Sequence, residues 1–535
     1  MIPTRKPSPK EVADTRKYVA NFIDQPDFYN EPLAYRVPKN LSKTFLISKT
    51  PPWCSPDEWV NACWYVTGTI CLLQRKAKAK GKKDFFNVPL HAATLRKTLG
   101  ENYSSFIDHM KSADVGLIIR TGDYYPGLQS TQYSLGTDYR DQPGKFRPIT
   151  NPAIKERLAR WKHDDWKEQK QRLVDYYYIT RWLYSGKLAI NMEAALTELP
   201  GYRERKVSVI NNSNWSEEKK SRELQKLDDE LKRMTKHITC FDPSVGVKVD
   251  DRGRLYSSVT KINSILRTFI TYDGQEMVCI DLKGSQPLHF LFCTRQEFYS
   301  KTDEFSLHKL KPEQAKHVME YTNVKHLKTV YKTLSIILLK NTQTLTDKGF
   351  QLPNFATIIR EGRLYEHIQE YFELHYPTSK CCNSRSKAKL WVMEMFYNKV
   401  VRFGKQKVKH WRILKVLFPE VAALITILKA ERYQDLAHLL QMIEAKMLLE
   451  KVCKNIFNAN PSIPIFTVHD SILTTREHAS TVKEILLATY REYLDFDAQL
   501  HDKALNPKEY TDTVDDYILD KLKLARKESK NRAAA

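Results

Sequence analysis

The sequence contains no uninterrupted run of about 18 apolar residues, so no membrane-spanning helix is expected. Its first residues, MIPTRKPSPKEVADTRK, contain no apolar core, and we therefore expect no secretory signal there. The nine cysteines include no CxxC pair. An odd number of cysteines without metal-ligand spacing indicates reduced thiols in a cytoplasmic or equivalent host-cell compartment. There is no internal repeat and no long low-complexity tract.

Positive charge is what the chain has in excess. Lys and Arg total 86 against 63 for Asp and Glu, a net charge of +23. A surplus of this size favours a polyanionic partner such as nucleic acid. An acidic membrane surface would also attract it, but no Lys-rich amphipathic anchor is evident, and a merely basic soluble protein is the third interpretation. The 42% hydrophobic content is typical of a folded protein, and 535 residues predict two to four domains.

Four regions follow from the pattern along the chain. Residues 1–60 are Pro-rich and predict an irregular, basic N-terminal segment. Residues 61–140 contain a small helix-and-strand module, and 141–240 are mostly helical and charged, as in a linker or a thumb-like region. Residues 241–535 hold the motifs that carry chemistry, with the main boundary expected near 235–245.

Local signals within the first half are more specific. The stretch 57–75 predicts a helix, the basic run 76–83 a loop, and 216–236, with its alternating charges, a long exposed connecting helix. In the small module, two short helices end near Gly100 and Ala113 and precede a strand–turn–strand segment. This order is that of a winged helix-turn-helix, whose second helix can enter a major groove. A small packing domain is the alternative.

Two carboxylates follow buried strand patterns. In the segment SIPIFTVHDSILT, an apolar run ends at His469 and Asp470 and a second run follows, which predicts a hairpin with Asp470 at its tip. The short run Met277–Ile280 ends in Asp281. A lone Asp after a strand is usually a turn residue. Two of them brought together can bind two Mg²⁺ ions and support in-line attack on a phosphate.

A helix predicted over 385–398 carries a stripe of four side chains. Arg385, Lys389, Met393 and Tyr397 recur every four residues and therefore lie along one slowly drifting face. The cations suit the phosphates of a nucleoside triphosphate, while the thioether and the ring suit its sugar and base. An ordinary amphipathic helix with cations reaching to solvent is the alternative interpretation.

Two further segments suit nucleic-acid contacts. The segment DDRGRLYSSVTKINSILRTF places Arg254 and Arg267 on mixed strand and loop, where they can meet phosphates or a groove. Residues 418–457 predict two helices with a break near 431–435. The second carries Gln441 and Glu444 on an otherwise apolar surface, where Gln441 could read a minor groove or be a satisfied core amide.

Taken in order, these segments resemble the family A polymerase superfamily, which includes DNA polymerases and phage-type single-subunit RNA polymerases. CIDLKGSQPLHF is similar to its motif A, RSKAKLWVMEMFY to motif B and FTVHDSI to motif C, while GRLYSS is similar to the segment before motif A. The resemblance covers about 250–510. It implies an α+β fold, with a palm–fingers–thumb core and a mostly helical N-terminal region.

The resemblance also implies the roles of single residues. The metal site would hold two Mg²⁺ ions, or Mn²⁺ in their place, on Asp281, Asp470 and the backbone carbonyl of Leu282. By the same resemblance, Lys389 and Arg385 would neutralise charge on the leaving group. The residues implied to bind the nucleotide are Met393, Tyr397 and Gln286. Those implied to bind the primer–template duplex are Arg254, Arg267, Gln441 and His469. The implied partners are a template–primer duplex and nucleoside triphosphates, without a membrane, for a monomer.

The motifs mix the two branches of the superfamily. DNA polymerases usually have Glu, which excludes a 2′-hydroxyl, and RNA polymerases have Gly where this chain has Gln286. Ser471 is RNA-polymerase-like, whereas the short spacing from Arg254 to Asp281 is DNA-polymerase-like. No promoter-recognition insertion is evident between Lys389 and His469. Asn398 stands where both branches have Gly, so the hinge of this helix differs.

These features favour a DNA polymerase that replicates a phage or mobile element. Asp175, Glu193 and Glu198 lack the context of a proofreading exonuclease, so none is expected. The first alternative is a single-subunit DNA-directed RNA polymerase or primase-like enzyme. The second is a non-catalytic DNA-binding replication initiator on a polymerase scaffold, which the intact Asp281 and Asp470 disfavour.

Overall fold

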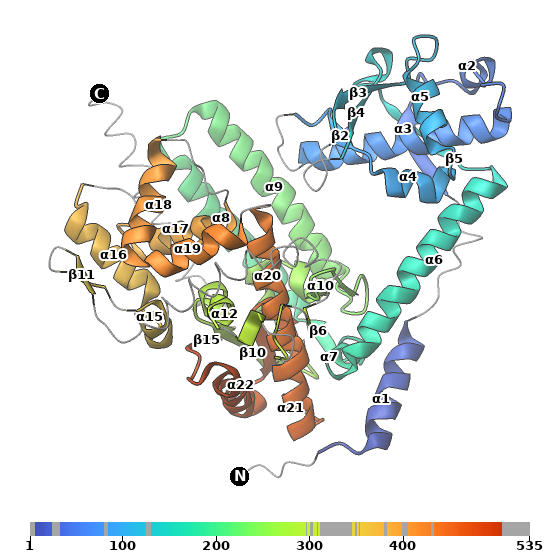
Figure 1. Cartoon of the computed structure of the whole chain (residues 1–535). Helices are drawn as coiled ribbons and strands as arrows, with labels where there is room; N and C mark the ends of the chain where they lie inside the picture. The colour runs from blue at the N-terminus through green and yellow to red at the C-terminus, as the bar shows by residue number, and fades with distance from the viewer. Residues whose placement is uncertain are drawn as a thin grey trace. The chain divides into compact units, whose positions relative to one another are not determined.

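The computed structural model describes residues 6–23, 33–79, 84–124, 130–295, 354–378, 382–398, 405–429 and 433–504, and short stretches between 297 and 352. It contains both helices and antiparallel sheets, as the α+β expectation requires (Figure 1). The chain forms two compact units. A small unit comprises Ile23–Gln171, and a large unit comprises Met1–Phe22 and Arg172–Ala535. Within the described ranges, no helix is both long and apolar enough to cross a membrane.

The small unit is built around one long buried helix. Helix α3 is buried from Trp59 to Gly68 because apolar residues occupy every side of it. An antiparallel ribbon of β1 and β5 packs against it, and the unit ends in the long helix α6. The elements are β1 (Ala34–Pro38), α2 (Lys43–Ser48), α3 (Pro56–Ala79), η1 (Thr137–Tyr139), β5 (Gly144–Pro148) and α6 (Pro152–Asp175).

A helix-and-strand module completes the small unit. Helix α4 ends at Gly100, whose φ of 86° favours glycine. Helix α5 buries Phe106, Ile107 and Met110, as its spacing predicts. Three strands then form an antiparallel sheet in the order β2-β4-β3. The bounds are β2 (Val88–Pro89), α4 (Ala92–Leu99), α5 (Tyr103–Lys111), β3 (Ile118–Gly122) and β4 (Gln132–Leu135).

The N-terminal segment is more regular than the prediction of an irregular 1–60. Helix α1 (Pro9–Phe22) forms there, and the sequence carries its start signal. The backbone N–H of Glu11 donates to the Ser8 hydroxyl at 3.2 Å, and that of Ser8 donates to the Glu11 carboxylate at 2.7 Å. This reciprocal pair is a capping box, with proline at the first helical position. Residues 76–79 likewise continue α3 instead of forming a loop, while 80–83 lie outside the described residues.

The core of the large unit is a six-stranded antiparallel sheet. Its order is β13-β14-β10-β9-β6, and β15 also pairs with β10, so β10 lies between β14 and β15. The first elements of this unit are α7 (Tyr177–Leu183), β6 (Leu188–Ile190), α8 (Met192–Asn211), α9 (Glu217–Thr239), β7 (Lys248–Val249), β8 (Leu255–Tyr256), α10 (Ser258–Lys261), α11 (Ser264–Arg267), β9 (Ile270–Tyr272), β10 (Gln275–Leu282), α12 (Ser285–Cys293) and η2 (Glu297–Tyr299).

Further helices, the β13–β14 hairpin and strand β15 complete the large unit. Helices α20 and α21 are joined through the π-helical segment η3 into one rod, visible in orange-red in Figure 1. The later elements are β11 (Leu345–Asp347), β12 (Phe350–Leu352), α15 (Phe355–Glu361), α16 (Leu364–His375), α17 (Arg385–Tyr397), α18 (Lys405–Leu417), α19 (Pro419–Leu428), α20 (Gln434–Ala445), η3 (Lys446–Cys453), α21 (Lys454–Ala459), β13 (Phe466–Val468), β14 (Ser471–Thr475), η4 (Arg476–His478), α22 (Ala479–Leu494) and β15 (Leu500–Ala504).

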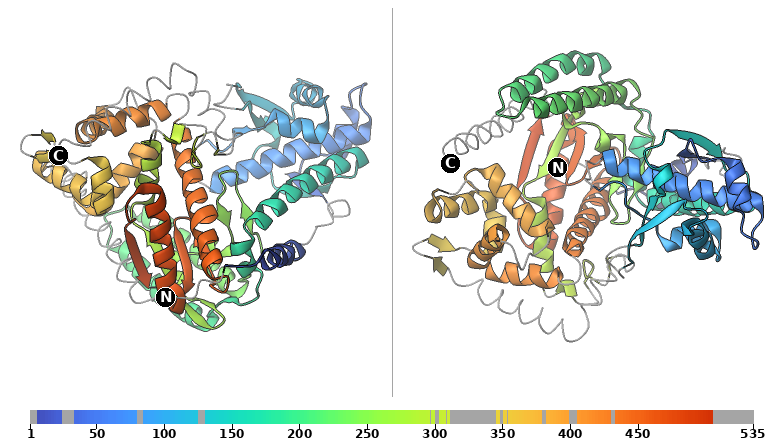
Figure 2. Two further views of the ribbon diagram at one scale, coloured as in Figure 1. Left: turned by 60° about the horizontal axis from the view of Figure 1, so that its bottom comes forward. Right: turned by 90° about the horizontal axis from the view of Figure 1, so that it is seen from above.

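The boundary between compact units falls at Gln171, not near 235–245. The reason is packing, because α9 is not the isolated connecting helix that its charges suggest. It lies beside α8 (Figure 2) and buries Leu227, Met234 and Ile238. These side chains belong to a core cluster that extends to Phe466 in β13, so residues on both sides of 240 fold together.

Candidate active site

The main chains of the two predicted carboxylates lie close together, Asp281 near the end of β10 and Asp470 in the turn that leads into the adjacent strand β14. Strand β10 pairs with β14 so that Asp281 is opposite Ser471, and the Ser471 hydroxyl donates to the Asp281 carboxylate at 2.6 Å. Asp470 is next to Ser471, in the two-residue turn between β13 and β14. The hairpin predicted from the sequence is therefore present. Its register brings the main chain of Asp470 close to Asp281, although the two lie far apart in sequence.

The turn itself has an unusual backbone. His469 has a φ of 55°, in the left-handed region that favours glycine, and it leads directly into Asp470. Its ring meets the edge of the Tyr256 ring, with centroids 6.0 Å apart. Partial burial lowers the pKa of His469, and the nearby guanidinium groups of Arg254 and Arg267 lower it further. His469, Arg254 and Arg267 therefore lie within electrostatic range of one another, and the nearby carboxylate of Asp250 acts on His469 in the opposite direction.

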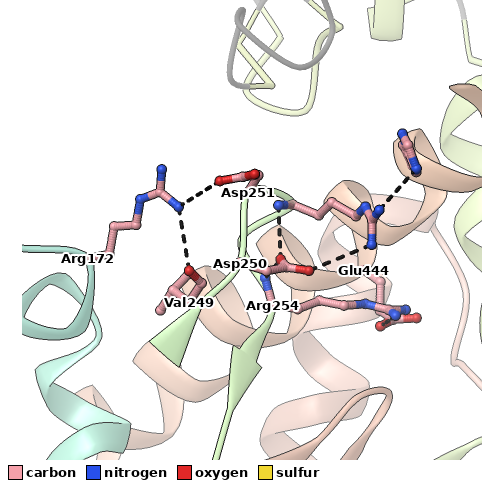
Figure 3. Close-up of polar contacts among 8 residues, drawn as sticks. Arg172, Val249, Asp250, Asp251, Arg254 and Glu444 are labelled. Atoms are coloured by element: carbon pink, nitrogen blue, oxygen red, sulfur yellow. Dashed lines mark hydrogen bonds and ion pairs between the residues drawn. The ribbon is translucent and has the colours of Figure 1, made fainter. Parts of the chain in front are cut away.

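A buried carboxylate to which the sequence analysis assigned no role lies beside this region. Glu444 on α20 is 2% exposed and pairs with Arg254, whose nitrogen lies 2.6 Å from its oxygen. Figure 3 shows Arg254 pointing toward Glu444. The Gln286 amide donates to the other carboxylate oxygen at 2.5 Å, and the Ser285 hydroxyl donates to that oxygen at 3.3 Å. Residues of two separate segments, Arg254 and the adjacent Ser285 and Gln286, therefore converge on Glu444.

The charge on Glu444 is finely balanced. Burial raises its pKa to about 7, Arg254 opposes the increase, and the negative charge of Asp470 adds to it. Asp470 is therefore near enough to act on Glu444 electrostatically. Several buried atoms also lack a hydrogen-bond partner among the described residues. They include the Gln286 carbonyl oxygen, the Arg254 Nε and the Gln441 carbonyl oxygen. Unsatisfied buried groups are rare and often mark places where a ligand or water binds.

Helix α17 presents the predicted stripe to a partly open surface. Arg385 and Lys389 are exposed, whereas Met393 and Tyr397 are half-buried. Arg385 lies 5.3 Å from the centre of the Tyr365 ring and pairs with Glu366 at 2.5 Å. Lys389 has no ion pair or hydrogen bond with any described residue, so its ammonium group is available to a ligand.

The pKa values of Tyr397 and Tyr365 indicate that the end of α17 lies near the hairpin that carries Asp470. Burial raises the pKa of Tyr397 to about 12, and the negative charges of Glu444 and Asp470 add to the increase. Burial also raises the pKa of Tyr365 to about 12, again with a contribution from Asp470. Asp470, Glu444 and the end of the α17 stripe therefore lie within electrostatic range of one another.

The C-terminal end of α17 is held by a buried lysine. Lys429, 6% exposed, follows α19 and donates to the carbonyls of Met395 and Asn398 at 2.6 and 2.7 Å. A cation at this end satisfies carbonyls that the helix leaves free. Burial lowers the pKa of Lys429 to about 7. The position where the superfamily has Gly, Asn398, is therefore anchored in this chain.

Two of the predicted site residues have surroundings that bear on their predicted roles. Arg267 uses its guanidinium to donate to the backbone carbonyls of Val259 and Ile262, so it braces α10 and α11. Leu282 is the buried last residue of β10. Sequence reasoning missed the roles of Glu444 and Lys429. A charged residue in an apolar helical run was the available signal for Glu444.

The carboxylate pair offers oxygen ligands of the kind that Mg²⁺ prefers. Within the part of the chain that the structure describes, no group of three or more His, Cys, Asp or Glu residues could hold a metal ion. Mg²⁺ commonly uses one or two protein carboxylates and completes its shell with water and substrate phosphates. A site of that kind needs no more than two protein carboxylates, which is the number that Asp281 and Asp470 would supply.

Comparison with known proteins gives little further identification. No protein-family model matches the chain, and no curated protein matches it. Among solved structures, the chain is similar to the POL domain of Pol1 from M. smegmatis in complex with DNA primer–template and dNTP. The identity is 12%, the TM-score is 0.27, and the match covers 65% of this chain and 72% of that chain. At these values the likeness assigns neither a site nor an activity to this chain.

Proposed function

We propose that this protein is a template-dependent nucleotidyltransferase, most readily a DNA polymerase that replicates a phage or mobile element without proofreading. The observation that carries the proposal is the register of β10 and β14, with Asp281 opposite Ser471 and Asp470 at the adjoining turn. The electrostatic influence of Asp470 on Tyr397 supports a nucleotide site between the hairpin and α17.

In this proposal the six-stranded sheet is a palm and helices α15–α18 are fingers. Helices α8 and α9 form a thumb-like pair. The order of α3, β2, α4, α5, β3 and β4, with the sheet order β2-β4-β3, supports a winged helix-turn-helix in the small unit. Helix α5 would then be the element that enters a groove of DNA.

The residues around the pair have separate tasks in the proposed reaction. Asp281 and Asp470 would hold two Mg²⁺ ions, with the Leu282 carbonyl as a further ligand. When bound, these ions activate the primer 3′-hydroxyl and stabilise the departing pyrophosphate. Ser471 holds the Asp281 carboxylate in one orientation through its hydrogen bond.

The α17 cations serve the triphosphate end of the substrate. Lys389 and Arg385 would neutralise the charge that develops on the leaving group. Lys389 has no partner among the described residues, which suits this task, whereas Arg385 would first have to leave Glu366. Met393 and Tyr397 would contact the sugar and base. Arg254, Gln441 and His469 would contact the primer–template duplex.

We also propose that Gln286 contacts the sugar of the incoming nucleotide. Its amide nitrogen is held by Glu444, which leaves its buried carbonyl oxygen unpartnered among the described residues. Gln286 has a carbonyl oxygen that can accept a hydrogen bond from a ribose hydroxyl. A preference for deoxynucleotides would therefore be incomplete, and the RNA polymerase or primase-like alternative is decided by the same assay.

Primer extension on DNA and RNA templates, with dNTPs and NTPs in parallel, tests the proposal. We expect Mg²⁺-dependent incorporation by the native chain, a loss of at least about 1,000-fold in Asp470→Asn, and unchanged template–primer binding in that variant. Asp229→Asn, at an exposed position on α9, is the matched control and should retain activity.

The possible outcomes separate the three readings. Incorporation of NTPs without a primer would replace the DNA polymerase by the RNA polymerase or primase-like enzyme. Tight binding to template–primer without incorporation under any of these conditions would refute catalysis and leave the non-catalytic initiator.

A further inference from the structure

The small unit contains a cavity that the proposed reaction does not use. Its volume is about 360 Å³, which lies within the range of small-ligand sites. The end of α3, the β1–β5 ribbon and the residues just before β2 form its walls. The lining residues that bear on its chemistry are Arg36, Arg75, Lys78, Phe85, Phe86 and Asp141.

Three cations face one carboxylate in this cavity. Arg36, Arg75 and Lys78 form no ion pair with any described residue, so the excess positive charge is not cancelled within the described chain. Burial raises the pKa of the Cys71 thiol, and Arg75 and Arg36 both oppose that increase. Arg36, Arg75 and Cys71 all line the cavity, so an anion bound there would meet both guanidinium groups.

Gly144 in the ribbon leaves room for the Arg36 side chain. The Arg36 side chain crosses Gly144 so closely that a Cβ added to Gly144 would lie 2.5 Å from the Arg36 Nε. The register of β1 and β5 places Pro38 opposite Gly144, so the arginine lies across the ribbon. Any side chain at position 144 would therefore collide with Arg36 and displace this cation from its place across the ribbon.

Aromatic rings form a second wall. The ring centroids of Phe85 and Phe86 are 4.2 Å apart, and both residues are half-buried. The Gln74 amide donates to the Phe86 carbonyl at 2.8 Å and ties this segment to α3. The Lys78 ammonium lies 5.1 Å from the centre of the Phe85 ring. An aromatic surface and a group of cations thus lie side by side.

We propose that this cavity binds one nucleotide of a single-stranded nucleic acid, with the phosphate on Arg36, Arg75 and Lys78 and the base against Phe86. Cations that follow a backbone and aromatic rings that stack with bases are the usual means of holding single strands. A duplex keeps its bases stacked inside, so it cannot offer one to this wall. The overall charge of +23 favours a strand over a free nucleotide. The site is separate from α5 and does not depend on the proposed catalysis.

Photocrosslinking of the full chain tests this assignment. A single-stranded oligonucleotide with 5-iodouracil is irradiated with the protein, and the crosslinked peptide is identified by mass spectrometry. We expect a crosslink at Phe85 or Phe86. Phe86→Leu and Lys78→Gln should each reduce it by about 3-fold or more, the first because the base loses its stacking partner and the second because the phosphate loses a cation. The matched controls Phe146→Leu, an exposed ring on β5, and Lys76→Gln, on α3 outside the cavity, should leave it unchanged.

Competition and an inactive variant complete the design. Unlabelled single strand should displace the crosslink, whereas an equal nucleotide concentration of duplex or of free dTMP should not. Crosslinks elsewhere only, equal displacement by duplex, or full displacement by dTMP would each overturn the proposal. Asp470→Asn should crosslink like the native chain, so failure of this site and failure of the proposed polymerase remain distinguishable. Far-UV circular dichroism verifies that each variant is folded.

Discussion

Glu444→Gln should remove a pH-dependent loss of stability that the native chain carries. The Glu444 carboxyl is buried, and its pKa is raised from the usual 4.5 to about 7. A carboxyl with a higher pKa in the folded state binds more protons when folded. The native chain should therefore lose stability as the pH rises from about 4.5 through 7. At 1.36 kcal/mol per pKa unit, the loss is about 3 kcal/mol.

Urea unfolding of both chains at several pH values between about 5 and 8 measures this effect. Glutamine has no charge to lose and can still accept a hydrogen bond from Arg254. The stability of the variant relative to the native chain should therefore increase by about 3 kcal/mol across this range. Glu370→Gln is the matched control. Glu370 forms an exposed ion pair with Arg363, so its loss should cost less than about 1 kcal/mol at every pH.

Parallel pH curves for the native chain and Glu444→Gln would refute the reasoning. They would mean that Glu444 stays ionised throughout, with the attraction of Arg254 exceeding the cost of burial. If the stability of the native chain instead rises with pH relative to the variant, Glu444 also stays ionised. Glu444 and Arg254 would then form an ordinary ion pair.

Three other changes have defined outcomes. Because burial lowers the pKa of Lys429 to about 7, the native chain should gain stability between about pH 7 and 10, and Lys429→Met should abolish that gain in urea unfolding. The same variant should show faster hydrogen exchange at the C-terminal end of α17, and unchanged exchange there would contradict the anchoring role. Ser471→Ala should cost about 1 kcal/mol and raise the Mg²⁺ concentration needed for half-maximal extension, because Asp281 loses its hydrogen bond; an unchanged Mg²⁺ titration would argue against that role. Ser8→Ala should cost about 1 kcal/mol through loss of the cap of α1, detected as faster exchange in its first turn, and equal exchange would exclude the cap.

Local patterns predicted the elements that carry the candidate site. The hairpin around Asp470 and the strand that contains Asp281 are alternating or apolar runs next to a turn, and both are present. The helix over 385–398 is present as α17, because its residues are good helix formers without a breaker. The capping box at Ser8 was also readable, yet the density of proline there favoured an irregular assignment.

Pairings between distant segments were beyond the sequence. The contact between Gln286 and Glu444 joins residues 158 positions apart, and no local period encodes it. The same holds for Lys429 at the end of α17. The domain boundary was misplaced for a related reason. The charges of α9 suggest exposure, while its three buried apolar residues on one face place it in the core of the large unit.

The position of α1 has a consequence for the order in which this protein is made. Helix α1 belongs to the large unit, and the Tyr18 hydroxyl donates to the carbonyl of Tyr184, 166 residues later. During synthesis, this helix must leave the ribosome and wait until the whole small unit has followed before it meets α7. A chain begun at residue 172 would lack α1 and expose the surface of α7 that it covers. Expression of the large unit therefore needs both of its sequence segments, joined or supplied together.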